Sequence, residues 1–364
     1  MTEPFHSPLH DRHVALGAKF SEFGGWLMPL QYSGVVAEHR AVRTAVGVFD
    51  VSHLGKLRVT GPGAADFVNR CLTNDLGRII PGQAQYTLCC NDAGGTVDDI
   101  FTYLISPDEV FLVPNAANNE TVSGLLSAAA PEGVTVTNEH RDHAVIAVQG
   151  TSSDEVLDAL ELPTGHDYLT FVTATYAGTE LIVCRTGYTG ERGYELIVPA
   201  VSAGVVWDAV LAAGAEYDIL PCGLGARDTL RTEMGYPLHG HDLSPEISPV
   251  MANLNWAIGW TKDDFWGAAA LRAQREAKSG PLLRGLKAKG RGIPRPHMRV
   301  QAGGADVGEV TSGTFSPTLG TGIALALLDR SVPVGGSVDV VVRDRLEPFE
   351  VVKPPFVEPG VREA

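Results

Sequence analysis

Two adjacent aspartates, Asp98 and Asp99, interrupt an otherwise apolar stretch that is typical of a β-strand. Successive side chains of a strand point to opposite faces, so one of the two carboxylates is expected to face inward. A buried carboxylate without a partner costs several kcal/mol. An inward aspartate therefore predicts a ligand or a cation beside it, and the alternative is a solvated acidic pair next to the turn at 91–95.

Glu195 presents the same problem in a second strand-like run, Tyr194 to Val198, where glutamate is disfavoured. A carboxylate offers two parallel acceptors, which match two parallel N–H donors. Such donors occur on an arginine fork and on the aminopyrimidine edge of a pterin or guanine. Arg227 and Arg231 lie one helical turn apart and share a face, so an internal ion pair with one of them is the alternative to ligand binding.

Aromatic side chains accompany these acids in the sequence. Five of them form the candidate set: Tyr86, Tyr168, Tyr188, Tyr236 and Trp26. A flat heteroaromatic ligand held between such rings and oriented by a carboxylate makes an ordinary small-molecule site. Each ring could equally belong to the core, because periodicity alone does not distinguish the two.

Motifs for other chemistries are weak. Gly223 and Gly225 lack the third glycine of a dinucleotide fingerprint, and no P-loop motif occurs. The run His239-Gly-His241-Asp242 has no further Cys or His at ligand spacing, so a polar loop is favoured over a metal site. The five cysteines are odd in number and contain no Cys-x-x-Cys pair, which argues against a disulfide framework and a structural zinc site.

A mixed scaffold of helices and strands must position these residues. Strands are expected at 56–60, 85–90, 96–105, 109–113, 143–149, 181–184 and 194–198, and helices at 61–72, 118–129, 153–160, 205–213 and 225–235. This order lacks the strict alternation of a doubly wound sheet and predicts an α+β fold. Residues 1–49 are expected to be loop-like apart from a helix at 38–45. Beyond a boundary near 279–281, short Val-rich strands between Gly and Pro turns predict a small β-barrel.

The composition is that of a folded globular protein. The 364 residues allow two or three domains, and 44% of them are apolar and 20% charged. A net charge of −15 gives no global support for nucleic-acid binding. The N-terminus lacks the features of a targeting segment, and no apolar run approaches the roughly 18 residues of a membrane helix. We therefore expect a cytoplasmic protein without membrane insertion.

Nine segments in order along the chain resemble the glycine cleavage T-protein family of aminomethyltransferases. They include FGGWLMP at 23–29, RTGYTGE at 185–191 and TSGTFSPTLG at 311–320, and the others lie at 47–53, 73–75, 86–99, 115–118, 193–195 and 223–228. Each segment is weak alone, but nine in family order between Leu9 and Phe356 are highly specific. One departure is His239, which stands where many relatives have a tyrosine.

The resemblance implies three domains in a ring around a central tetrahydrofolate site, formed by 1–54 with 140–245, by 55–139 with 246–279, and by a C-terminal β-barrel at 280–364. It implies an enzyme of glycine catabolism and one-carbon metabolism. The reaction would transfer the aminomethyl-derived one-carbon unit from the lipoyl arm of the H protein to tetrahydrofolate, releasing ammonia and forming methylene-tetrahydrofolate. Tetrahydrofolate is then the acceptor substrate and the lipoylated H protein the partner, with no metal required.

The resemblance also assigns the site residues. The family's critical acid is the second of the aspartate pair, which gives the catalytic role to Asp99 and a structural role to Asp98. A carboxylate at that position would stabilise the cationic, iminium-like species that develops during the transfer. Eight residues are expected to bind the folate, with the last near the mouth of the pocket: Glu195, Tyr86, Asn115, Tyr168, Tyr188, Arg227, Tyr236 and Arg362.

Two alternatives share this fold. The first is a non-catalytic folate-binding assembly factor for iron–sulfur proteins, whose Lys-Gly-Cys-Tyr type of motif this chain lacks. The second is the folate-linked half of a sarcosine or dimethylglycine dehydrogenase, which is fused to a flavin domain for which 364 residues leave no room.

Overall fold

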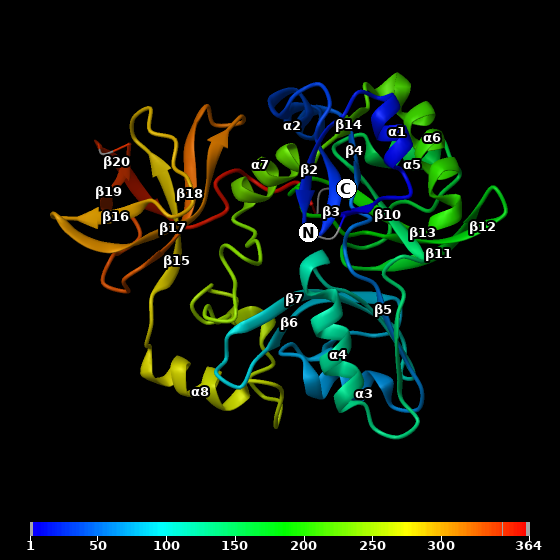
Figure 1. Ribbon diagram of the computed structural model, residues 1–364, viewed down its shortest axis with the longest axis horizontal. Coiled ribbons are helices and arrows are strands. Elements are labelled where there is room, and N and C mark those ends of the chain that lie inside the picture. The colour runs from blue at the N-terminus through cyan, green and yellow to red at the C-terminus, as the bar shows by residue number, and fades with distance from the viewer. Residues whose placement is uncertain (1–2, 344, 362–364) are drawn as a thin grey trace.

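The computed structural model describes residues 3–343 and 345–361. Its strands form a three-stranded, a five-stranded and a six-stranded sheet and a closed barrel. Figure 1 shows the barrel on one side of the molecule and the two larger sheets with their helices on the other. The predicted α+β class and C-terminal barrel are confirmed. Among the described residues, no helix is long and apolar enough to cross a membrane.

The five-stranded sheet carries the aspartate pair. Its order is β6-β7-β8-β5-β9, with β5 (Leu57–Thr60), β6 (Gln83–Cys90), β7 (Thr96–Ser106), β8 (Glu109–Val113) and β9 (Thr135–Asn138). Helices α3 (Ala64–Cys71) and α4 (Asn119–Ala129) cover its outer face. Phe67 of α3 and Leu126 of α4 pack there against Leu57 and Ile100 of the strands.

The six-stranded sheet carries Glu195. Its order is β11-β12-β13-β10-β4-β14, with β4 (Gly47–Asp50), β10 (His143–Gln149), β11 (Phe171–Tyr176), β12 (Thr179–Cys184), β13 (Gly193–Pro199) and β14 (Leu220–Cys222). Helices α5 (Ser153–Asp158) and α6 (Ala203–Ala213) pack on its outer face through Leu157 and Trp207. The inner faces of the two large sheets share one core, in which Tyr103 and Phe111 meet Val145 and Ile197.

The N-terminal 49 residues are not loop-like, so that prediction is wrong. They contain β1 (Phe5–His6), α1 (His10–Ala15), β2 (Lys19–Phe23), β3 (Trp26–Gln31), α2 (Val35–Thr44) and the start of β4. Strands β2 and β3 pair as a hairpin whose turn residues Gly24 and Gly25 have φ of 56° and 82°. Glycine takes such angles without strain, so the Gly-Gly pair marks a hairpin rather than an irregular loop.

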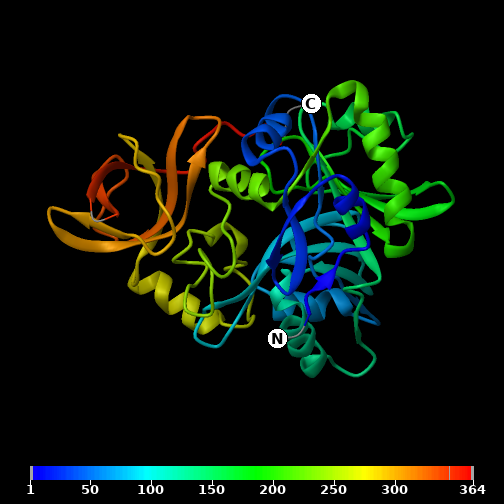
Figure 2. The ribbon, with the colours of Figure 1, turned by 45° about the horizontal axis from the view of Figure 1, so that its top comes forward.

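The rest of the chain joins the sheets to the barrel. Helix α7 (Leu224–Met234) lies at the centre in Figures 1 and 2, between the six-stranded sheet and the barrel. Helix α8 (Ala268–Ala277) precedes the barrel strands β15 (Leu282–Ala288), β16 (Arg299–Ala302), β17 (Ala305–Ser316), β18 (Thr321–Leu328), β19 (Ser337–Val342) and β20 (Arg345–Val352). Short 3-10 turns occur at 76–78, 116–118, 200–202, 214–217 and 255–257. The domain boundaries expected from the sequence stay a prediction.

Candidate active site

A cavity of about 1220 Å³ is lined by residues of both large sheets, of α7 and of the barrel. The structure brings together eight of the predicted site residues on its wall: Tyr86, Asp99, Asn115, Tyr168, Tyr188, Glu195, Arg227 and Tyr236. The ninth, Arg362, lies outside the described residues, although Val361 just before it lines the cavity. Trp26 does not belong to this wall, because it is buried beside Met28 and packs against Phe5 and His140.

Asp98 and Asp99 point to opposite faces of strand β7 in the β6–β7 hairpin, as the alternation of side chains along a strand predicts. Asp98 pairs with Cys89 and Asp99 with Leu88 across the strands. Asp98 is fully buried, away from the cavity wall, whereas Asp99 faces the cavity. The expectation that the inward carboxylate meets a ligand or a cation is wrong for Asp98, because amide groups satisfy it.

Asn115 holds both carboxylates at once. Its backbone N–H donates to Asp98 Oδ2 at 2.9 Å, and its Nδ2 lies 2.8 Å from Asp98 Oδ1 and 2.8 Å from Asp99 Oδ1. Tyr86 donates its hydroxyl to Asp99 Oδ2 at 2.9 Å. Donors from neutral groups fix the position of Asp99 without neutralising its charge, so the carboxylate stays available to a ligand.

Burial sets the protonation behaviour of this pair. It raises the pKa of Asp98, and the charge of Asp99 adds to that rise. Burial also raises the pKa of Asp99, although the hydrogen bond from Tyr86 opposes the change. A raised pKa brings a carboxylate closer to the range in which it can accept and return a proton during a reaction.

A second layer of contacts supports Asp98 from the far side. Asn118 donates Nδ2–H to Asp98 Oδ1 at 2.7 Å, and the same Nδ2 lies 3.0 Å from His239 Nδ1. His239 Nε2 lies 3.0 Å from the carbonyl oxygen of Thr96. His239 therefore links Asn118 to the backbone of β7 and orients the Asn118 amide toward Asp98.

The backbone of the loop that contains Ser244 and Pro245 approaches the β6–β7 hairpin closely. At Gly95 in the β6–β7 turn, an added Cβ would lie 1.7 Å from the carbonyl oxygen of Pro245. Thr96 N–H donates to Ser244 O at 2.9 Å next to this point. Only glycine leaves room for this contact between the β6–β7 turn and Pro245.

Glu195 is a buried acid that forms no ion pair within the described part of the chain. It lies on β13, and Thr186 donates its hydroxyl to Glu195 Oε2 at 2.6 Å. Arg231 instead pairs with Asp228 at 2.7 Å and with Asp242 at 2.9 Å. Within residues 3–343 and 345–361, neither Arg227 nor Arg231 forms an ion pair with Glu195, so the alternative of an internal salt bridge is wrong.

Arg227 and two tyrosines form another part of the cavity wall. The guanidinium carbon of Arg227 lies 4.6 Å from the ring centroid of Tyr188, whose centroid lies 5.7 Å from that of Tyr236. The Tyr188 hydroxyl donates to the carbonyl of Pro237, which fixes the ring. Burial lowers the pKa of Arg227, and the nearby Glu195 opposes that change. A fixed cation stacked on a ring suits a flat ligand that also carries an acceptor.

Sequence reasoning missed two cavity residues with chemistry of their own. Trp256 is 61% exposed, and its ring stacks on Tyr86 with centroids 5.4 Å apart. His53 also lines the cavity, and burial together with the charge of Arg227 lowers its pKa to about 3. His53 ends one of the family segments, whereas a lone exposed tryptophan in a loop leaves no periodic signal in the sequence.

Two family models match nearly the whole chain. The GCVT N-terminal domain covers residues 9–262, and the glycine cleavage T-protein C-terminal barrel domain covers residues 282–358. Matching the second model, residues 282–352 form the closed barrel.

Similar proteins agree with these models. An aminomethyltransferase of Frankia alni is 61% identical over 360 residues, which span 98% of this chain and 99% of that protein. An aminomethyltransferase of Mycobacterium tuberculosis is 60% identical over 357 residues, spanning 98% of this chain and 97% of that protein. The crystal structure of glycine cleavage system aminomethyltransferase T from Bartonella henselae superposes with a TM-score of 0.92 at 30% identity and covers 98% of both chains.

Proposed function

This chain belongs to the glycine cleavage T-protein family of aminomethyltransferases, and we propose that it transfers an aminomethyl-derived one-carbon unit from the lipoyl arm of an H protein to tetrahydrofolate. In this reaction the C–S and C–N bonds of the aminomethyl carbon break, and two C–N bonds to folate nitrogens form. The two protons from those nitrogens go to the lipoyl sulfur and to the departing ammonia, so the atoms balance without an oxidant.

One observation carries the proposal: the half-buried Asp99 and the buried Glu195, neither of which forms an ion pair within the described residues, line one cavity with aromatic walls. The pyrimidine edge of a pteridine offers paired N–H donors, which complement a carboxylate such as Glu195. The rings of Tyr188 and Tyr236 supply a flat apolar surface against which the bicyclic pteridine ring can stack. The cavity of about 1220 Å³ is large enough for a folate.

Asp99 would act on the reacting carbon. Its carboxylate stabilises the positive charge that develops when the aminomethyl carbon loses its sulfur or its amine. Because the pKa of Asp99 is raised by burial, it is also suited to take a proton from a folate nitrogen and pass it on. Tyr86 and Asn115 keep the carboxylate aimed into the cavity.

Release of ammonia from an aminomethyl-loaded H protein tests this function. We expect ammonia and methylene-tetrahydrofolate to form in equal amounts, and only when tetrahydrofolate is present. Binding of tetrahydrofolate without any turnover would overturn the proposal and favour a non-catalytic folate-binding protein of the same fold.

We also propose that the chain divides at the predicted boundaries, 1–54 with 140–245, 55–139 with 246–279, and 280–364, and that the protein works in the cytoplasm. The discontinuity is supported by β4 (Gly47–Asp50), which pairs with β10 and β14 of the six-stranded sheet although the five-stranded sheet intervenes in sequence. Limited proteolysis that releases the barrel from the remainder would support the last boundary.

A further inference from the structure

Positive charge is concentrated in one segment of this acidic protein. Residues 262–299 contain ten Lys or Arg and three Asp or Glu, in a chain whose net charge is −15. A local excess of one sign on an oppositely charged molecule creates a field that steers a complementary partner. The segment begins just before α8 and ends in the barrel strand β16.

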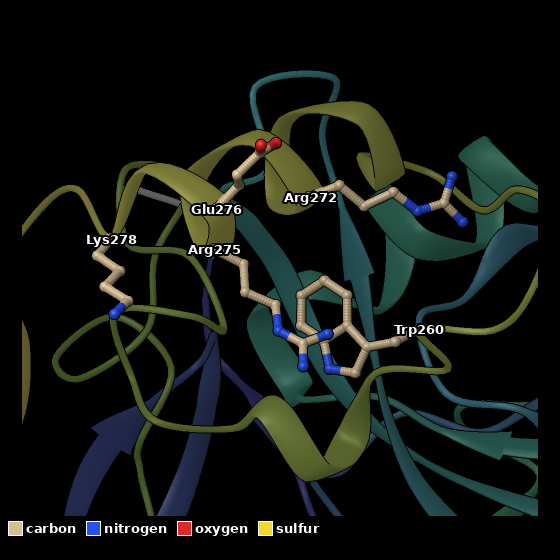
Figure 3. Close-up of a pocket in the computed structure, with 5 residues that line it drawn as sticks. All are labelled: Trp260, Arg272, Arg275, Glu276 and Lys278. Atoms are coloured by element: carbon tan, nitrogen blue, oxygen red, sulfur yellow. The ribbon is translucent and has the colours of Figure 1, made fainter.

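Helix α8 presents part of this charge around a shallow hollow. The hollow measures about 420 Å³ and is lined by Trp260, Arg272, Arg275, Glu276 and Lys278. Figure 3 shows the Arg275 side chain against the indole ring of Trp260. The guanidinium carbon of Arg275 lies 4.3 Å from the centroid of Trp260.

The three cations Arg272, Arg275 and Lys278 are exposed, and the two arginines are also held in place. Arg272 donates to the carbonyl oxygens of Lys262 and Asp263. Arg275 is fixed by its ring contact with Trp260. Within residues 3–343 and 345–361, none of Arg272, Arg275 and Lys278 forms an ion pair. Arginine and tryptophan are among the residue types that contribute most to binding energy at protein interfaces.

A short loop connects this hollow to the catalytic cavity. Trp260 Nε1–H donates to the carbonyl of Asn255 at 3.0 Å. The next residue, Trp256, is 61% exposed, lines the cavity and stacks on Tyr86. Tyr86 in turn donates to Asp99. The hollow and the catalytic acid are therefore linked by direct contacts through one turn of chain.

We propose that the α8 surface, formed by Trp256, Trp260, Arg272, Arg275 and Lys278, docks an acidic face of the protein that delivers the aminomethyl group. This inference rests on the proposed function, in which the substrate arrives on the lipoyl arm of another protein. A carrier must dock beside the cavity for its arm to enter, and Trp256 marks a place where cavity and surface meet. The cations attract an acidic carrier, and the exposed tryptophan supplies apolar contact area.

Charge reversal on α8 tests this docking surface. The variant Arg275→Glu/Lys278→Glu is compared with Arg40→Glu/Arg70→Glu, which reverses two exposed arginines on α2 and α3. We expect the α8 variant to raise the KM for aminomethyl-loaded H protein about tenfold or more, as expected when interfacial charges are reversed. Its kcat, its affinity for tetrahydrofolate and its turnover of free aminomethyl-lipoamide should match those of the control. The dependence of KM on salt should flatten in the α8 variant alone.

Three outcomes would overturn the inference. Equal KM values for both variants would show that the surface does not bind the carrier. An equal loss with free aminomethyl-lipoamide would show that α8 shapes the cavity instead. If sedimentation shows that the wild type is a dimer and the α8 variant is a monomer, the surface binds a second copy of this chain instead. If wild-type protein lacks folate-dependent turnover altogether, the proposed function fails, and calorimetric binding of H protein to both variants still decides the docking question.

Discussion

Two regions of the molecule bury acidic side chains in opposite ways. Where α2 and α7 meet the barrel, Glu233 lies 2.8 Å from Arg43 Nη2 and 3.3 Å from His39 Nε2. In the cavity, Asp99 and Glu195 receive hydrogen bonds from a tyrosine, an amide and a threonine. The first arrangement neutralises the acid, and the second positions it while leaving its charge for a ligand.

The pKa values of Glu233 and Asp99 shift in opposite directions, in line with their different partners. Burial alone would raise the pKa of Glu233, but the hydrogen bond from His39, with help from Ser316 and Arg43, lowers it to about 2. In the cavity the effect of burial prevails, and the pKa of Asp99 is raised. The comparison teaches that the partner of a buried carboxylate, more than its depth, separates an acid that stabilises the fold from one that can do chemistry.

Asp99→Asn should have the largest effect on activity. Loss of the positioned charge is expected to lower turnover by about 10²–10⁴, the range for a proton-transferring side chain, with a much smaller change in folate affinity. Single-turnover ammonia release from aminomethyl-loaded H protein measures the change. Asp98→Asn is the matched control. An equal loss of turnover in that variant would contradict the assignment of the catalytic role to Asp99 alone.

Glu233→Gln should instead act on stability. Removal of one charge from the buried cluster leaves Arg43 with one carboxylate partner, Glu191, and is expected to cost about 3–5 kcal/mol of unfolding free energy. Denaturant unfolding measures this loss, and the kcat of the folded fraction should stay near that of the wild type. A Glu233→Gln variant that keeps its stability but has a low kcat would contradict the assignment of a purely stabilising role to Glu233.

The pH dependence of stability sharpens the same contrast. Because the pKa of Glu233 falls from 4.5 to about 2 on folding, its contribution is complete above pH 4.5 and is lost as the pH falls toward 2. Asp98 and Asp99 have raised pKa values, so their contribution declines as the pH rises above 3.8. Unfolding of wild type and Glu233→Gln between pH 2 and 4.5 should show a steeper loss in the wild type, and parallel curves would contradict this assignment.

Glu195→Gln should weaken folate binding without a comparable effect on the transfer step. A charge-assisted hydrogen bond contributes about 1.5–3 kcal/mol, which corresponds to roughly a tenfold to a hundredfold change in Kd. Calorimetric titration with tetrahydrofolate measures it. Unchanged affinity would leave Glu195 as a structural residue held by Thr186.

His239→Phe should have the smallest effect. It removes the group that orients Asn118 while leaving the Asn115 contacts to both aspartates in place. A neutral hydrogen bond is worth about 0.5–1.5 kcal/mol, so kcat should fall by no more than roughly tenfold, with little change in the KM for tetrahydrofolate. His239→Gln, which can still donate and accept, should recover part of the loss.

Local patterns predicted much of the fold and the chemical core of the site. Alternation along one strand placed Asp98 and Asp99 on opposite faces, and a glutamate in an apolar strand marked Glu195. The loss of helical periodicity after residue 280 marked the barrel. These signals are short-range, because they follow from the period of a single element.

What remained hidden depends on contacts between distant segments. The hydrogen bond between Asn118 and His239 joins residues 121 positions apart, and the stacking of Trp256 on Tyr86 follows from the path of a loop. The N-terminal sheet escaped because β1 has two residues and a Gly-Gly turn divides the others. Such features arise only when the two sheets, α7 and the barrel are packed together.

A titration of tetrahydrofolate into the wild type, Glu195→Gln and Glu233→Gln, followed by calorimetry at one pH, tests the central claim most directly. The account predicts saturable binding to the wild type, the same affinity in the Glu233 variant and a clearly weaker one in the Glu195 variant. No heat and no thermal protection with the wild type, or equal weakening in both variants, would contradict it.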